Sequence, residues 1–240
     1  MLQISHFSKT YPGGKTAVQD LSLEVQAGQI VGFIGHNGAG KSTTLRAVAG
    51  ILPFETGSIT VGGYDIHTQP VQAKRVMAFL PDNPDLYEFM SGIKFLNFVA
   101  DLYGIPAAER TSRIQQYAGA YELTDALGSA IGSYSHGMKQ KLALISALIR
   151  RPRLLILDEP FVGLDPKASH LLKQQLRELC AEGGAVLFST HVLEVAEKLC
   201  DRIAIIRQGQ LVASGATAEI VGASSLEDVF LELEGGGDGK

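Results

Sequence analysis

The sequence predicts an α/β fold built around a mostly parallel β-sheet. Two short apolar segments with strand character, residues 154–157 and 185–188, are separated by a helical pattern over residues 167–181. A strand, a helix and a second strand in this order form a βαβ unit, which implies parallel pairing. A continuous apolar run at residues 29–34 suits a strand buried on both faces, and it leads toward a predicted helix at residues 42–49.

Further strands are expected at residues 21–25, 57–61 and 76–80, the last of which is stopped by Pro81. Residues 203–206 and 210–213 flank Gln208-Gly209 and predict a hairpin. These segments complete the set of predicted strands.

Residues 87–150 have no strand pattern and are expected to form a helical subdomain inserted between strands. Ser91 is placed to cap a first helix, and residues 107–120 and 136–149 predict two more. The chain is expected to form a single domain over residues 1–233, followed by a Gly-rich disordered tail at residues 234–240.

Composition excludes several classes of protein. The 240 residues have a formal net charge of -4, which gives no support for a nucleic-acid binder. No apolar stretch approaches the roughly 20 residues of a membrane-spanning helix, and no signal peptide is evident. Cys180 and Cys200 fit no metal spacing and are expected to be packing residues. The sequence therefore predicts a cytoplasmic chain that would act at a membrane only through a partner.

A phosphate-binding loop is predicted where the buried strand meets the helix. The segment Gly35-His36-Asn37-Gly38-Ala39-Gly40-Lys41-Ser42 fits the pattern of Gly, four residues and Gly-Lys-Ser/Thr. Glycines allow successive backbone N–H groups to face one anion, and the helix N-terminus adds its dipole. In such loops the lysine reaches the β- and γ-phosphates and the hydroxyl binds Mg²⁺. ATP and Mg²⁺ are the expected ligands.

Two acidic residues complete the predicted site. The apolar strand at residues 154–157 ends in Asp158-Glu159, so both carboxylates lie at the sheet edge where ligands bind in open α/β folds. Asp158 is placed to hold Mg²⁺ and Glu159 to polarise the attacking water. The chain is therefore predicted to hydrolyse ATP.

The rest of the chain resembles the nucleotide-binding subunit of ATP-binding-cassette (ABC) transporters. The resemblance spans residues 2 to about 215 and depends on five further elements in family order. They are Tyr11 before the phosphate loop, Asp82 at the Gln-loop position, the signature-like segment Tyr134-Ser135-His136-Gly137-Met138-Lys139-Gln140, the Asp-loop Gly163-Leu164-Asp165-Pro166 and His191 at the switch position. The ending at residues 225–233 and the unusual signature resemble the ABC-2 exporter branch, including the Ecs-type ATPases.

This resemblance implies a P-loop NTPase core with a mostly parallel sheet, an N-terminal antiparallel β subdomain and the helical subdomain. Glu159, His191 and Lys41 are the expected catalytic residues, and Ser42, Asp158 and Asp82 the expected metal-site residues. The expected nucleotide-binding residues are Tyr11, Gly35, His36, Asn37, Gly38, Ala39, Gly40, Lys41, Ser42, Thr43, Ser135, Gly137 and Asp165.

Two departures from the family pattern leave roles open. Asp82 replaces a glutamine, so its shorter side chain is expected to reach the metal through water. His136 in the signature either donates to a phosphate or faces solvent. Asp165-Pro166 also suits an ordinary helix start, with Asp as the cap and Pro in the first turn.

The family pairs two cassettes head to tail with ATP between them, which implies a homodimer or a heterodimer with another ABC subunit. It also implies a membrane-spanning partner on a separate chain at the cytoplasmic face, and an export function. The apolar residues Leu86, Tyr87, Phe89 and Met90 make residues 82–103 the expected dock for this partner, and the alternative is that they pack into the core of the helical subdomain. The alternatives are a soluble ABC ATPase of DNA repair or translation and a regulatory module without turnover. The chain has no heptad arm or Cys cluster for the first, and Glu159 and His191 argue against the second.

Overall fold

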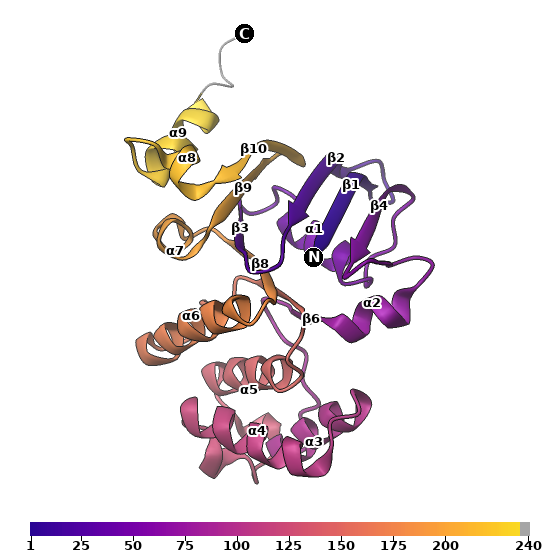
Figure 1. Ribbon diagram of the computed structural model, residues 1–240, viewed down its shortest axis with the longest axis vertical. Coiled ribbons are helices and arrows are strands. Elements are labelled where there is room, and N and C mark those ends of the chain that lie inside the picture. The colour runs from indigo at the N-terminus through magenta and orange to yellow at the C-terminus, as the bar shows by residue number, and fades with distance from the viewer. Residues whose placement is uncertain (236–240) are drawn as a thin grey trace.

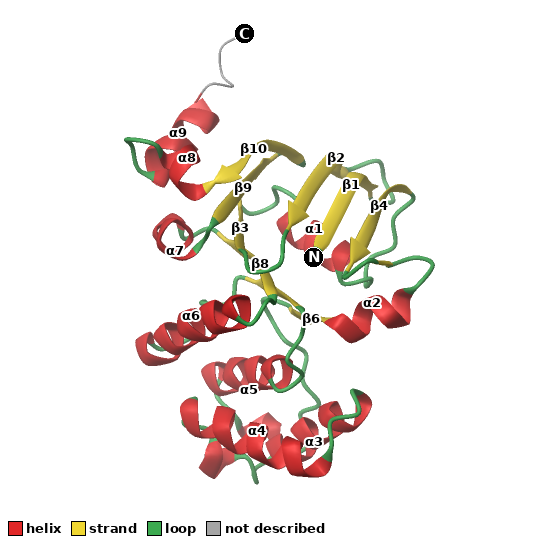
Figure 2. Ribbon diagram, viewed as in Figure 1, coloured by secondary structure: helices red, strands yellow, loops and turns green. Residues whose placement is uncertain are grey.

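The computed structural model describes residues 1–235, which form two β-sheets and a group of helices (Figures 1 and 2). One sheet is antiparallel and has the strand order β2-β1-β4-β5. Its strands are β1 Leu2–Thr10, β2 Thr16–Val25, β4 Thr56–Val61 and β5 Tyr64–Asp65. This sheet confirms the expected N-terminal antiparallel subdomain.

The second sheet has six strands in the order β10-β9-β3-β8-β7-β6. Every neighbouring pair is parallel except β9 and β10, which form the predicted hairpin. The strands are β3 Ile30–Ile34, β6 Met77–Leu80, β7 Leu154–Asp158, β8 Ala185–Thr190, β9 Arg202–Arg207 and β10 Gln210–Ala216. The prediction of a mostly parallel sheet is therefore confirmed.

The helices agree with the sequence where the apolar pattern is long, whereas three short α-helices and the C-terminal helix were not predicted. The predicted ones are α1 Lys41–Val48, α3 Gly92–Leu102, α4 Ala107–Ala120, α5 His136–Leu148 and α6 Pro166–Ala181. The unpredicted ones are α2 Pro70–Val76, α7 Leu193–Leu199 and α8 Thr217–Val221. The last helix, α9 Leu226–Gly235, covers the exporter-like ending. It extends into the segment expected to be a tail, and residues 236–240 of that expectation lie outside the described residues.

The helical subdomain lies at one end of the molecule (Figure 1). Within residues 87–150, all of which the structure describes, the secondary structure is helical apart from one β-bridge between Ser91 and Ala130. Ser91 occupies the N-cap position of α3, although its side chain makes no capping hydrogen bond. Tyr121 donates a 2.7 Å hydrogen bond to Gln175 on α6, which ties the helices to the sheet core.

The parallel sheet is buried on both faces because its strands alternate between two hydrophobic cores. In β7, Leu155 and Leu157 pack in the core shared with the helical subdomain, whereas Leu154 and Ile156 pack in the core under the antiparallel sheet. Each fully buried leucine contributes about 1.5–3 kcal/mol to folding. A continuous apolar run in the sequence is the consequence of this two-sided burial.

The cysteines and the hydropathy of the helices can also be compared with the expectations from the sequence. Cys180 and Cys200 are both free thiols with buried side chains, in agreement with a packing role. No helix among the described residues is both long enough and apolar enough to cross a membrane.

Candidate nucleotide-binding site

The phosphate loop connects β3 to α1, and two of its glycines are required by close packing. A Cβ atom on Gly35 would lie 2.4 Å from the backbone oxygen of Ile206. Gly40 has a φ of 112°, and a Cβ there would lie 2.6 Å from the backbone oxygen of Ala17. Only glycine fits both positions without a shift of the backbone. The loop is thus held against β9 and β2 in a fixed conformation.

Lys41, the first residue of α1, is folded back onto this loop. Its side chain is 6% exposed, and its Nζ atom donates hydrogen bonds to the backbone oxygens of Gly35 and His36, the latter at 3.2 Å. Burial lowers the pKa of Lys41, while the negative charges of Glu159 and Asp158 raise it. A phosphate bound in the loop would provide this desolvated cation with a strong anionic partner.

The two acids lie at the end of β7, next to the end of β8. Asp158 pairs in register with Ser189, whose hydroxyl donates a 2.5 Å hydrogen bond to the Asp158 carboxylate. The backbone N–H of Glu159 donates to the same hydroxyl at 3.0 Å. Glu159 has a φ of 48°, an uncommon backbone conformation for a non-glycine residue. Ser189 therefore fixes both acids, a role that the sequence analysis missed.

One oxygen of each acid is buried without a hydrogen-bond partner among the described residues. These oxygens are Oδ2 of Asp158 and Oε1 of Glu159. The ammonium of Lys41 lies nearby, with its Nζ atom 3.8 Å from that same Oε1 atom. A buried acceptor without a partner is costly, and carboxylate and hydroxyl oxygens are the ligands that Mg²⁺ prefers. Together with the hydroxyl of Ser42, this donor set suits a hydrated Mg²⁺ ion.

His191 follows β8 and contacts Glu159 directly. Its Nδ1 atom lies 3.0 Å from Oε2 of Glu159, and the side chain is 52% exposed. The imidazole therefore directs its Nδ1 edge toward the acid, and about half of the side chain is open to solvent. This arrangement orients the carboxylate and leaves the histidine free to meet a bound ligand.

Tyr11 lies beside the loop from the antiparallel sheet. Its hydroxyl is 3.2 Å from Oγ1 of Thr43, and the ammonium of Lys9 lies 5.9 Å from the ring centre. A cavity of about 280 Å³ joins these parts. Its lining consists of Tyr11, Lys15, Ala17, His36, Asn37, Gly38, Gly40, Lys41, Ser42, Thr43, Asp82, Asp158 and Glu159. Of these, Lys15 and Ala17 were not predicted, because nothing in their local sequence distinguishes them from ordinary strand-end residues.

Asp82 follows β6, is exposed and lines this cavity. The sequence had placed it near the metal, and the structure brings it into the same cavity as Asp158 and Ser42.

Ser135, Gly137 and Asp165 do not line this cavity. Ser135 caps α5 by accepting a 3.3 Å hydrogen bond from the Met138 N–H. Asp165 caps α6 through the Ala168 N–H at 2.8 Å and pairs with Lys141 at 2.7 Å, as its helix-start interpretation predicted. These three residues therefore form a second, separate group of candidate ligand contacts.

The unusual His136 belongs to this second group and lies against the Asp-loop. A Cβ on Gly163 would approach its ring to 2.9 Å, and a Cβ on Gly137 would lie 3.1 Å from the Gly163 backbone oxygen. His136 is nevertheless exposed. The signature-like segment and the Asp-loop thus form one continuous surface.

A phosphate loop next to paired strand-end acids defines a nucleotide-binding ATPase. The family model described as ABC transporter matches residues 18–162, which is more than half of the chain. The chain therefore belongs to the ABC transporter family, and it is an ATP-binding and ATP-hydrolysing subunit.

Curated relatives agree with this assignment. The linearmycin resistance ATP-binding protein LnrL of Bacillus subtilis is 36% identical over 92% of this chain and 70% of its own length. From the same organism, NatA is 35% identical over 89% of this chain and 87% of NatA. EcsA is 34% identical over 94% of each chain. These relatives support the transporter interpretation over the DNA-repair or translation alternative.

Solved structures agree on the fold. The structure of an ATP-binding subunit of an ABC transporter has a TM-score of 0.93 and 34% identity, covering 98% of this chain and 99% of the other. The dimeric ATP-binding cassette MJ0796, in a post-hydrolysis state with ADP and Pi, has a TM-score of 0.82 at 21% identity, covering 90% and 99%. The second likeness is one of fold alone.

Proposed function

We propose that the cavity beside the phosphate loop binds ATP together with Mg²⁺, and that residues 1–233 form one nucleotide-binding domain. The observation behind this proposal is that Lys41, Asp158 and Glu159 converge in one cavity with two buried carboxylate oxygens that have no hydrogen-bond partner among the described residues. Ser42 and Asp158 would hold the metal, and Asp82 would reach it through water. The aromatic ring of Tyr11 would stack on the adenine.

Glu159 is the proposed general base. It accepts a proton from a water molecule that attacks the γ-phosphorus in line, the bond to the bridging oxygen breaks, and ADP leaves with the bonding electrons. Lys41 stabilises the charge on the phosphates, and His191 holds Glu159 through their 3.0 Å contact. When bound, Mg²⁺ neutralises phosphate charge. Backbone N–H groups from Gly35 to Thr43 would surround the β-phosphate.

Ser135, Gly137 and Asp165 are proposed to act on the nucleotide held by a second chain. All three lie outside the cavity of their own chain. They belong to the surface that the signature-like segment and the Asp-loop form together. Either a second copy or a related ABC subunit would supply the complementary cavity. The dimeric assembly of MJ0796 is consistent with this arrangement, although that protein shares only the fold.

A membrane-spanning subunit is proposed to dock on residues 82–103, at the cytoplasmic face of the membrane. Phe89 is 85% exposed, Tyr87 50% and Phe98 44%. The rings of Phe89 and Phe98 lie 6.0 and 6.1 Å from that of Tyr87, so the three form a small cluster. Exposed aromatic clusters mark interaction sites, and this one begins at Tyr87, in the segment that follows Asp82 of the nucleotide cavity. Export is proposed from the resemblance of the signature-like segment and of residues 225–233 to the exporter branch.

Metal-dependent ATP hydrolysis by the purified chain tests the central proposal. Phosphate release should require Mg²⁺, stop on addition of EDTA and resume when Mg²⁺ is restored. Lys41→Ala should lose ATP binding while remaining folded by circular dichroism. Hydrolysis that persists in EDTA, or normal ATP binding by folded Lys41→Ala, would contradict the assigned site.

A further inference from the structure

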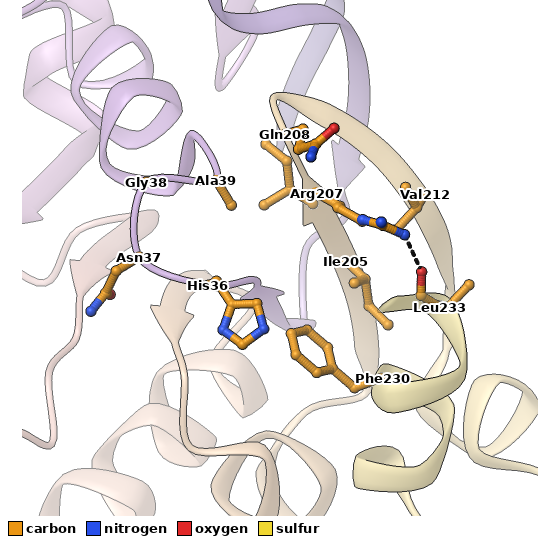
Figure 3. A pocket seen from close by; sticks show the side chains of 11 residues that line it. His36, Asn37, Gly38, Ala39, Ile205, Arg207, Gln208, Val212, Phe230 and Leu233 are labelled. Carbon is orange, nitrogen blue, oxygen red and sulfur yellow. Dashed lines mark hydrogen bonds between the residues drawn. The ribbon is translucent and has the colours of Figure 1, made fainter. Parts of the chain in front are cut away.

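The C-terminal helix α9 contacts the phosphate loop through a pair of rings. Phe230 of α9 and His36 of the loop have ring centroids 5.1 Å apart with an interplanar angle of 66°, an edge-to-face arrangement. Figure 3 shows the Phe230 side chain reaching from the helix toward the His36 ring. Phe230 is 8% exposed, so the helix buries this ring at the junction rather than leaving it to solvent.

The backbone of His36 takes part in the hydrogen bonds that shape the phosphate loop. Its backbone oxygen accepts hydrogen bonds from the Ala39 N–H at 3.1 Å and from Nζ of Lys41 at 3.2 Å. The conformation of residue 36 therefore determines where the loop turns and where the lysine ammonium rests before a nucleotide binds.

Cavities of about 240 and 190 Å³ flank the ring contact. Phe230 and His36 line both of them, so their rings form a partition between the two spaces. The smaller cavity also reaches His191. The contact between α9 and the loop at this pair of rings thus lies between two open spaces.

Both ends of α9 are attached to neighbouring elements. Leu226 is fully buried, and its N–H donates to the Glu197 carboxylate on α7 at 2.9 Å. Nη1 of Arg207 donates to the backbone oxygen of Leu233 at 2.5 Å (Figure 3). The helix is thus fixed to α7 and β9 at its two ends, with Phe230 between them.

We propose that Phe230 is a positioning residue for ATP binding, acting through His36 to hold the phosphate loop in its binding conformation. This inference rests on the proposed phosphate site. A loop ordered in advance loses less conformational freedom when ATP binds, so its affinity is higher. The exporter-like ending of the chain thereby acquires a role in the affinity for nucleotide.

Calorimetric titration with ATP and Mg²⁺ in the Glu159→Gln background measures the effect without turnover. Phe230→Ala should weaken binding by about 2- to 10-fold, as expected for loss of one aromatic pair. In the otherwise wild-type chain it should raise KM while leaving kcat nearly unchanged. Phe230→Tyr keeps the ring and should bind ATP normally.

A double-mutant cycle tests whether the effect passes through His36. If it does, His36→Ala combined with Phe230→Ala should weaken binding no more than the larger single effect. Phe230→Leu provides a milder variant should the alanine fail to fold, and it should also bind ATP more weakly than the wild type. Strict additivity in the cycle, or wild-type affinity in folded Phe230→Ala or Phe230→Leu, would overturn the inference.

The failure of this inference and the failure of the phosphate site are distinguishable. Wild-type ATP affinity in folded Phe230→Ala contradicts the inference alone, whereas normal ATP binding by folded Lys41→Ala would contradict the phosphate site itself.

Discussion

The Nδ1 atom of His191 lies 3.0 Å from Oε2 of Glu159, and the two residues belong to separate segments of the chain. Glu159 follows β7 and His191 follows β8, and the parallel pairing of these strands brings their carboxyl ends to one edge. Ser189 strengthens this link, because its hydroxyl bonds both to Asp158 and to the Glu159 backbone. The geometry of the proposed base is therefore set by the sheet rather than by its own loop.

Glu159→Gln should retain ATP binding and nearly abolish hydrolysis. The amide keeps the size of the side chain but loses the basicity toward water, which typically costs about 10²–10⁴ in rate. Steady-state phosphate release measures turnover, and size-exclusion chromatography with ATP should show an accumulated dimer. Near-normal hydrolysis by the mutant would reject the proposed role of Glu159.

A mixed dimer tests whether Ser135 acts on the other chain's nucleotide. Pairing a Lys41→Ala chain with a Ser135→Arg chain leaves one site with both residues intact, because they come from opposite chains. Tagged chains purified in sequence should give a dimer with hydrolysis well above that of either mutant homodimer. If the mixed dimer is as inactive as both mutant homodimers, the two sites do not work independently with Ser135 supplied by the second chain.

Phe89→Glu should leave the isolated subunit folded and able to bind ATP. Phe89 is 85% exposed, so its replacement removes little buried apolar surface. A charge in the aromatic cluster should instead prevent co-purification with the membrane subunit. Ala108→Glu, at another exposed position of the helical subdomain, serves as the control and should co-purify normally. Normal complex formation by Phe89→Glu would remove this residue from the proposed dock.

Neither cysteine should react quickly with Ellman's reagent at pH 8 until the protein unfolds. Burial raises the pKa of Cys180 to about 12 and that of Cys200 further still. Only the thiolate reacts, so both thiols are slow as well as inaccessible. Absorbance should report almost no fast thiol in the native protein and both after denaturation. A fast native phase would show that one side chain is accessible.

The same shifts predict a dependence of stability on pH. Both thiols have folded-state pKa values raised above the ordinary value of 9.0, so the folded protein keeps protons that the unfolded chain releases. The contribution of these groups is complete below pH 9 and is lost as the pH rises toward 12. Urea midpoints measured from pH 8 to 10.5 should fall less in a Cys180→Ala variant than in the wild type, relative to each protein at pH 8.

Long, periodic segments and short-range motifs were predictable. The bounds of α4 agree with its expected range, and β7, β8 and the β9–β10 hairpin follow their apolar runs. The phosphate loop and Asp158-Glu159 were found because their chemistry requires fixed residue types at fixed spacing. In each case the information is local, so one sequence is sufficient.

Features set by tertiary contacts were not predictable in the same way. The short helix α2 begins at Pro70 and has Ala73 as its buried residue, which leaves almost no apolar period. Lys15 and Ala17 reach the cavity only because β2 passes beside the loop. The contact between His36 and Phe230 joins the two ends of the chain, and no spacing rule connects them.

The position of β3 in the sheet has a consequence for biosynthesis. This strand leads into the phosphate loop, yet both of its neighbours, β8 and β9, are encoded roughly 150 residues or more further along the chain. At a synthesis rate of about 5–20 residues per second, β3 waits about 8 to 30 seconds on the ribosome before either partner exists. Its five residues are all buried in the finished sheet, so the nascent chain must keep an apolar strand with two open edges out of other pairings throughout that interval. A chain truncated before Ala185 should accordingly depend on chaperones and aggregate when they are withdrawn.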